Sequence, residues 1–138
     1  MTAEQMEQKY SHLWAKDGIR GIAVGTGWLP LVHAFLLACE HARTLDVKIE
    51  IRQIKEKLGG LRVYWQGPAG TSRSGQHTDL SAPKTPEQDL VDAIDYHDSA
   101  LIVMARHTCD VCGSKGSMRN LSGLLAVRCD IHANRDSQ

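Results

Sequence analysis

Two short pairs of metal-ligand residues near the end of the chain constrain its fold more than any other feature. Cys109 and Cys112 are separated by two residues, and Cys129 and His132 repeat that spacing after an interval of sixteen residues. Two thiolates at this spacing reach one ion from a tight turn, and three thiolates with one imidazole complete a tetrahedral zinc site. We therefore predict that these four residues bind one structural Zn²⁺, which leaves no open position for water or substrate.

The interval between the two pairs has the pattern of a small hairpin. Residues 120–124 are typical of a turn, and the flanking runs 118–121 and 124–127 are typical of short strands. The expected order is a turn carrying two cysteines, then a hairpin, then a ligand pair that opens a short helix. This order predicts a treble-clef or zinc-ribbon-like module over residues 108–138. Since its ligands meet only in the folded chain, the metal would contribute on the order of 10 kcal/mol to folding this segment.

The preceding residues 1–107 predict an α+β core in which three helices pack on a small antiparallel sheet. The first helix is indicated by Thr2 and Gln5, which have the spacing of a capping box. Apolar residues then recur at helical spacing as far as Trp14, and Asp17 with the following glycine stops the run.

The second helix is expected to follow a glycine-rich stretch at residues 21–27, which predicts a flexible connector. Thr26 or Gly27 can cap this helix, Pro30 is tolerated in its first turn, and the apolar pattern runs to about Arg43. The stretch lacks the Lys-Ser/Thr pair of a phosphate-binding loop, and no strand clearly precedes it.

The third helix is predicted to start at Thr85 and Pro86, a cap residue followed by proline at the first helical position. Its apolar pattern ends near His107, directly before the first metal ligand. Residues 67–84, which come before this helix, are rich in Gly, Ser, Thr and Pro, and they predict a mobile loop.

A period of two replaces the helical pattern in the middle of the chain. Val47, Ile49 and Ile51 alternate with charged residues, and alternation resumes at residues 61–65 after a turn around residues 58–60. The paired glycines of this turn can supply the positive φ values that a tight reversal requires. The pattern predicts an antiparallel hairpin with one buried face and one solvated face.

Basic residues gather around this hairpin although the chain as a whole has no net charge. The candidate partner-binding residues are Lys48, Arg52, Lys55, Lys57 and Arg62. A neutral chain does not fit a general nucleic-acid coat, because counterion release needs a marked excess of Lys and Arg. A local basic surface can instead select an acidic protein or a phosphate, and a merely solvated turn is the alternative interpretation.

Catalytic residues are not predicted. His97 lies between Asp95 and Asp98 and could act with an acid, but the sequence places no activated nucleophile and no second metal cluster beside it. The acidic, polar start of the chain lacks the pattern of a secretory signal, and no apolar run reaches membrane-spanning length. We therefore expect a non-enzymatic, cytoplasmic protein with no membrane partner.

Three stretches of the chain together resemble a family of small, largely uncharacterised proteins of bacteria, prophages and tailed phages. They are Gly27-Trp28 with Pro30-Leu31, the Lys55–Arg62 segment followed by Tyr64, and the Cys-x-x-Cys-Gly and Cys-Asp-x-His ending. The family pattern usually has Phe in place of Leu58, and a shorter stretch after the hairpin. The resemblance implies a phage or mobile-element setting and a metal-bearing C-terminus, and it implies no established activity.

These features favour a zinc-containing binding protein that engages or inhibits a host protein complex, with an anti-defence role as the specific hypothesis. The alternative is a nucleic-acid-binding regulator that uses the basic hairpin and the zinc module. The two hypotheses differ in the expected salt dependence of binding, which is steep only for nucleic acid.

Overall fold

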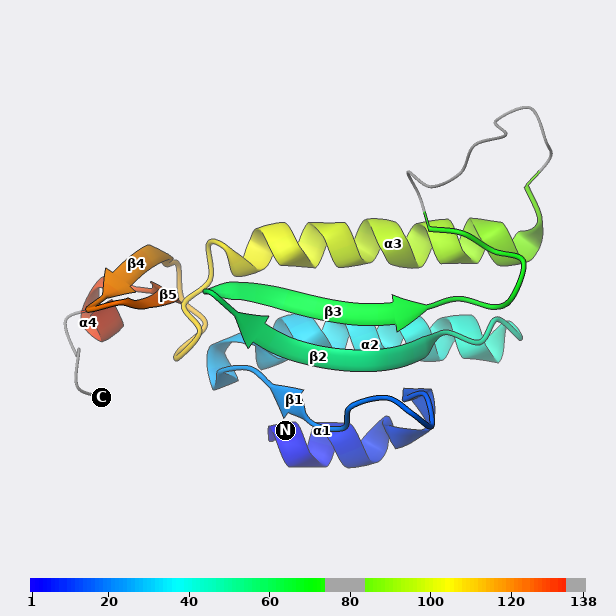
Figure 1. Cartoon of the computed structure of the whole chain (residues 1–138), viewed down its shortest axis with the longest axis horizontal. Helices are drawn as coiled ribbons and strands as arrows, with labels where there is room; N and C mark the ends of the chain where they lie inside the picture. The colour runs from blue at the N-terminus through cyan, green and yellow to red at the C-terminus, as the bar shows by residue number, and fades with distance from the viewer. Residues whose placement is uncertain (74–83, 134–138) are drawn as a thin grey trace.

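The computed structural model describes residues 1–73 and 84–133, and within them the chain is a mixed α+β protein with four helices and two small sheets (Figure 1). The helices are α1 (Ala3–Lys9), α2 (Leu29–Thr44), α3 (Pro86–Ala105) and α4 (Asp130–Ala133). The strands are β1 (Ile22–Ala23), β2 (Glu50–Lys57), β3 (Gly60–Gln66), β4 (Ser117–Leu121) and β5 (Leu124–Arg128). The α+β class is confirmed, whereas the expected count of three helices is not. Most of the loop predicted at 67–84 lies outside the described residues.

The first helix is shorter than its apolar pattern predicts. The capping box is confirmed, since Thr2 and Gln5 each bond the backbone amide of the other. However, α1 ends at Lys9, and after a single 3₁₀ turn the chain is extended at Trp14, which forms a parallel bridge with Ile51. Pairing with the sheet therefore overrides the helical periodicity from this point.

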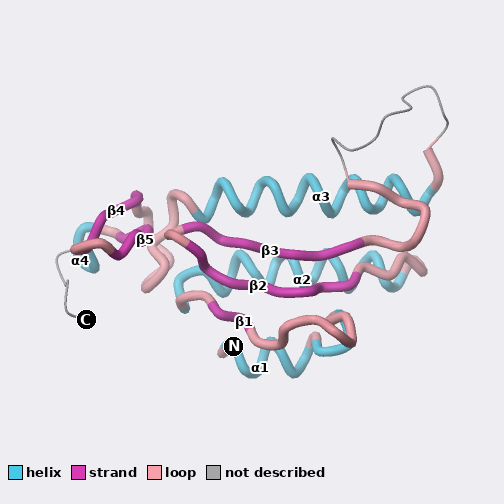
Figure 2. The backbone as a smooth tube through the Cα atoms, viewed as in Figure 1, coloured by secondary structure: helices cyan, strands magenta, loops and turns pink. Residues whose placement is uncertain are grey.

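The larger sheet has the order β1-β2-β3 (Figure 2). Strand β1 is parallel to β2, and β2 is antiparallel to β3. The predicted antiparallel hairpin is thus β2 and β3, but the sheet as a whole is mixed. The additional strand, β1, lies inside residues 21–27, so the prediction of a flexible connector there is wrong. Helix α2 provides the crossover that parallel neighbours require.

The reversal between β2 and β3 differs from the expected paired-glycine turn. Lys57 pairs with Gly60, and the two residues between them, Leu58 and Gly59, have φ values of 54° and 81°. Two positive φ values in a two-residue loop are the pattern of a type I′ turn, whose twist matches that of the strands. A leucine therefore occupies one of the two left-handed positions, and Gly60 begins β3.

The core lies between the sheet and helices α2 and α3, which also pack on each other. Helix α2 begins at Leu29 after a 3₁₀ turn over Thr26–Trp28, so neither Thr26 nor Gly27 is its cap, although Pro30 does lie in its first turn. The fully buried side chains include Trp28, Phe35, Leu36, Ile51, Ile54 and Leu61. No helix in the described part of the chain has the length and apolar content needed to cross a membrane.

Candidate metal centre

The four predicted metal ligands come together at one end of the molecule. The ligand atoms of Cys109, Cys112, Cys129 and His132 all lie within 4.8 Å of one another. The Cys112 and Cys129 sulfurs are 3.8 Å apart, and Nδ1 of His132 lies 3.6 Å from the Cys109 sulfur and 3.1 Å from that of Cys129. Bond lengths to zinc predict tetrahedral edges of about 3.8 Å for S–S and about 3.6 Å for S–N. Two of the three distances match these edges and the third is shorter, so the four residues fit a single metal ion.

The backbone around Cys109 forms the turn that this spacing requires. The amide of Gly113 donates to the Cys109 carbonyl at 2.9 Å, and the Cys109 amide donates to the Ser114 carbonyl at 2.7 Å. Gly113 has a φ of 82°, a conformation that glycine adopts without strain. The second pair opens α4, where the Ala133 amide donates to the Cys129 carbonyl.

The ligand cysteines are free, and one of them, Cys129, is shifted towards the thiolate form. None of the four cysteines of the chain forms a disulfide. The hydrogen bond from the backbone amide of His132 lowers the pKa of Cys129 to about 6, and the bond to Cys129 raises the pKa of His132. A thiolate is the form in which cysteine ligates a metal. The remaining cysteine, Cys39, is fully buried in the core, and burial raises the pKa of its thiol.

The turn that carries the first two ligands rests on residues 25–28. The Gly27 amide donates to the Asp110 carbonyl at 2.9 Å, and the Trp28 indole donates to the Thr108 carbonyl at 2.8 Å. A Cβ on Gly27 would lie 2.1 Å from the carbonyl oxygen of Cys109. The glycines before α2 therefore permit close approach to the metal turn, in the way that a phosphate loop permits approach to a phosphate.

The hairpin tip meets the metal centre from the other side. A Cβ on Gly59 would lie 2.7 Å from the sulfur of Met118, on β4, and 3.3 Å from the Leu125 carbonyl carbon. Figure 1 shows the β2–β3 turn directed at the small β4–β5 sheet. The ion pair between Arg128 and Asp110, at 2.6 Å, joins β5 to the metal turn. The metal centre thus contacts the core at two separate places.

The five predicted partner-binding residues divide into two groups. Lys55 and Arg62 are cross-strand partners, and Lys57 follows Lys55 by two residues, so all three share the face of the hairpin that points away from Ile54. Lys48 precedes β2 at its far end, and Arg52 is paired with Asp17 at 2.8 Å. Only the three residues near the turn therefore form a cluster.

A buried polar network on α3 has no counterpart in the sequence predictions. Arg73 bonds Asp95 at 3.0 Å and Asp98 at 2.9 Å, and its guanidinium lies 4.5 Å from the ring centroid of Trp65. The Trp65 indole also donates to Asp98. Burial raises the pKa of Asp98, and its hydrogen bonds to Trp65 and Arg73 oppose that effect. One carboxylate oxygen of Asp98 therefore accepts from both Trp65 and Arg73, whereas its other oxygen and Nδ1 of His97 are buried without a hydrogen-bond partner among the described residues.

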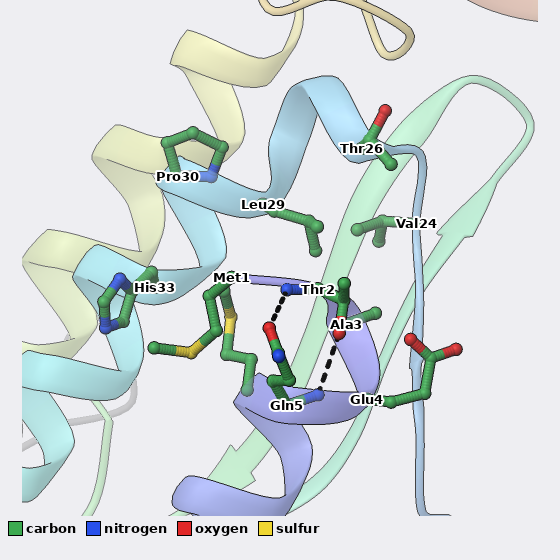
Figure 3. A pocket seen from close by; sticks show the side chains of 11 residues that line it. Met1, Thr2, Ala3, Glu4, Gln5, Val24, Thr26, Leu29, Pro30 and His33 are labelled. Carbon is green, nitrogen blue, oxygen red and sulfur yellow. Dashed lines mark hydrogen bonds between the residues drawn. The ribbon is translucent and has the colours of Figure 1, made fainter.

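A hollow of about 680 Å³ lies between the start of α1 and the start of α2 (Figure 3). Several of its polar groups are already bonded: Thr2 and Gln5 form the capping box, and Nε2 of His33 lies 2.9 Å from the Tyr10 hydroxyl. Met1 and Leu29 add apolar surface. This hollow offers contact area and brings no nucleophile beside a base.

Comparisons of the chain with protein-family models, with curated proteins and with solved structures find no match.

Proposed function

We propose that this is a zinc-stapled binding protein whose hairpin contacts an acidic surface on a host protein. The proposal rests mainly on one observation, the cluster of Lys55, Lys57 and Arg62 on one face of a rigid hairpin. No residue of this cluster has an ion pair within residues 1–73 and 84–133. Unpaired cations in fixed register favour a partner with complementary charge.

Zinc is the metal we propose for the centre. Three thiolates and one imidazole in tetrahedral geometry are typical of zinc, and four protein ligands make the site structural. We propose a treble-clef module, a proposal supported by the order of elements: a cysteine turn, the β4–β5 hairpin and α4 carrying His132. In this role the metal fixes the surface beside the hairpin and takes no part in a reaction.

The resemblance to phage and mobile-element proteins supplies the setting for the partner. A small protein with a closed metal site and a basic hairpin fits a role in blocking a host complex, and inhibition of a defence complex is the specific form we propose. Cytoplasmic location follows from that role.

Two measurements test the proposal. Native mass spectrometry should show one zinc ion that a chelator removes. Co-purification of the tagged protein from host lysate should recover one stoichiometric protein, and the double variant Lys55→Glu/Lys57→Glu should lose it while remaining folded. A metal-free folded protein would contradict the zinc assignment, and failure to recover any stoichiometric protein would contradict the binding role.

The second candidate function is a nucleic-acid-binding regulator. It is favoured by Tyr64, which is exposed on the same face and has the Lys55 ammonium 5.8 Å from its ring centroid. A base can stack on such a ring while the cations contact phosphates. Binding of a single-stranded oligonucleotide should then weaken at least tenfold between 50 and 200 mM salt, roughly as expected for three phosphate contacts. A flat response would exclude this function.

A further inference from the structure

A small hollow of about 270 Å³ lies where the hairpin turn, the end of α3 and strand β4 meet. Leu58, Leu61, Ile102 and Met118 supply its apolar side chains. A drug-sized ligand needs roughly 300–1,000 Å³. The hollow is therefore suited to one side chain of a larger partner.

Two arginines give this hollow a positive rim. Arg62 and Arg106 both line it and are exposed, and no acidic residue does so. Neither guanidinium has an ion pair to any residue that the structure describes. The nearby Glu56 carboxylate accepts a hydrogen bond from the Gly59 amide at 2.7 Å and so is held under the turn. Guanidinium groups bind carboxylates through paired, charge-assisted hydrogen bonds.

Leu58 has a position that folding alone does not explain. Its φ of 54° is unfavourable for a leucine, and its side chain is 67% exposed. Asparagine or glycine would satisfy the turn better. Strain at an exposed apolar residue that lines a hollow points to contact with another molecule.

We infer that this hollow binds a short acidic peptide segment of a partner protein, with an aliphatic side chain among Leu58, Ile102 and Met118 and neighbouring carboxylates on Arg62 and Arg106. The inference rests on the proposed binding function and names the chemistry of the partner. A protein segment fits better than a nucleic acid, because no aromatic residue lines the hollow to stack on a base.

The metal centre controls one wall of this hollow. Met118 lies on β4, whose partner strand β5 leads into Cys129, and it packs against Gly59. When the metal module unfolds, Met118 is released and the hollow loses that wall. Peptide binding should therefore require the metal although no ligand atom touches the peptide.

The test uses the zinc-loaded full chain with labelled methyl groups and a blocked peptide, acetyl-Asp-Glu-Leu-Asp-Glu-amide. Saturable shifts are expected at the methyls of Leu58, Ile102 and Met118, with a Kd of about 0.1 to 1 mM, as suits one anchor side chain. The peptide in which Asn and Gln replace the acids should bind at least tenfold more weakly. Equal binding of both peptides, or no shift at these methyls, would overturn the inference.

Variants separate binding from stability. Arg62→Gln/Arg106→Gln should weaken binding of the acidic peptide at least tenfold, whereas the matched Lys9→Gln/Lys16→Gln, which removes two exposed charges elsewhere, should not. Leu58→Asn should weaken peptide binding without loss of fold. Chelation of the metal should also weaken peptide binding. Undiminished binding in the arginine variant would overturn the inference, as would an oligothymidine that shifts the same methyls at lower concentration.

These outcomes are independent of the test of the proposed function. If Lys55→Glu/Lys57→Glu loses the host partner but Arg62→Gln/Arg106→Gln retains it, the proposed function is supported and the inference that the hollow binds an acidic peptide is contradicted. Peptide binding without any host partner in lysate would support the peptide-binding hollow and contradict the proposed function.

Discussion

Gly27 and Leu58 are single residues whose identity decides how distant parts of the chain meet. Gly27 has no side chain because the Cys109 carbonyl occupies the space that a Cβ would need. Leu58 keeps a large side chain where the backbone favours asparagine or glycine. Glycine at position 27 therefore stabilises the fold, whereas leucine at position 58 destabilises it.

Gly27→Ala is expected to lower the free energy of unfolding by about 3 kcal/mol, because the new Cβ would lie 2.1 Å from the backbone of the metal turn. Urea unfolding of the zinc-loaded protein measures this change. Gly60→Ala is the control, since its nearest neighbour would lie at an ordinary 3.5 Å. Similar midpoints for the two variants would show that the close contact at Gly27 is absent.

Leu58→Asn is expected to raise stability by about 1 kcal/mol, because asparagine tolerates the left-handed conformation. For a chain of this length that corresponds to a rise in Tm of about 3 °C. The same change at Leu37, an exposed residue of α2, should lower Tm, since asparagine is a weaker helix former there. A fall in Tm for Leu58→Asn would contradict the strain argument.

The packing of helix α3 involves charged groups. Its buried face includes Asp95 and Asp98, and Arg73 from the segment after β3 neutralises both. The same segment contributes Ser72, whose amide donates to the Gln88 side chain at 3.0 Å. Thr85 caps the helix through the Gln88 amide, while the Gln88 side chain bonds Ser72 and does not return to the Thr85 backbone.

Arg73→Met should lower stability at neutral pH by about 2 kcal/mol, because it leaves the Asp98 carboxylate buried without its cation. The pKa of Asp98, already raised by burial, would rise further in the folded variant. Because the folded variant then has a raised Asp98 pKa, its loss of stability is full at pH values above that pKa. The loss decreases as pH falls through the folded pKa towards the unfolded value of about 3.9. Denaturant unfolding between pH 7 and pH 4 measures the trend.

Arg20→Met provides the matched control for this prediction. Arg20 also pairs with a carboxylate, Glu7 at 3.2 Å, and lies over a tryptophan ring, but it is exposed. Its loss should change stability by about 0.5 kcal/mol or less at every pH. A deficit for Arg73→Met that stays constant or grows towards pH 4 would contradict the assignment to Asp98.

At the scale of the whole molecule, the metal centre and the core are in contact, although the sequence predicts two separate units with a boundary between residues 107 and 108. Residues 25–28 bind the metal turn, and Gly59 packs against β4. Loss of the metal should therefore weaken the core as well as the C-terminal segment.

Chelation, or the variant Cys129→Ser, should lower the Tm of the single main transition by about 10 °C, which corresponds to about 3 kcal/mol of shared contacts. Lys57→Glu, an exposed change on the hairpin, should leave Tm within about 2 °C. Calorimetry on the three samples measures this. If chelation leaves the core transition unmoved, the centre is an independent domain and the contacts at residues 25–28 contribute little.

Local spacing carried most of what the sequence predicted correctly. The Thr2–Gln5 capping box and the four metal ligands depend on neighbours a few residues apart, so their patterns are visible in the chain. Strand β1 has two residues, too few to show a period, and β-pairing of Trp14 competes with a helical pattern that looks continuous. The role of Gly27 and the Arg73 network depend on which distant segments meet, and no local signal records that.

The bond from the Trp28 indole to the Thr108 carbonyl joins residues 80 positions apart and sets an order of events during synthesis. The ribosome completes α2 and the hairpin long before the residues that cover Gly27 have been made. Until then the nascent protein exposes the glycine stretch and the edge of Trp28, and contacts this distant in sequence form slowly. Capture of the metal would then be the last step of maturation, and a cell short of that metal would accumulate chains that are fully translated but incompletely closed.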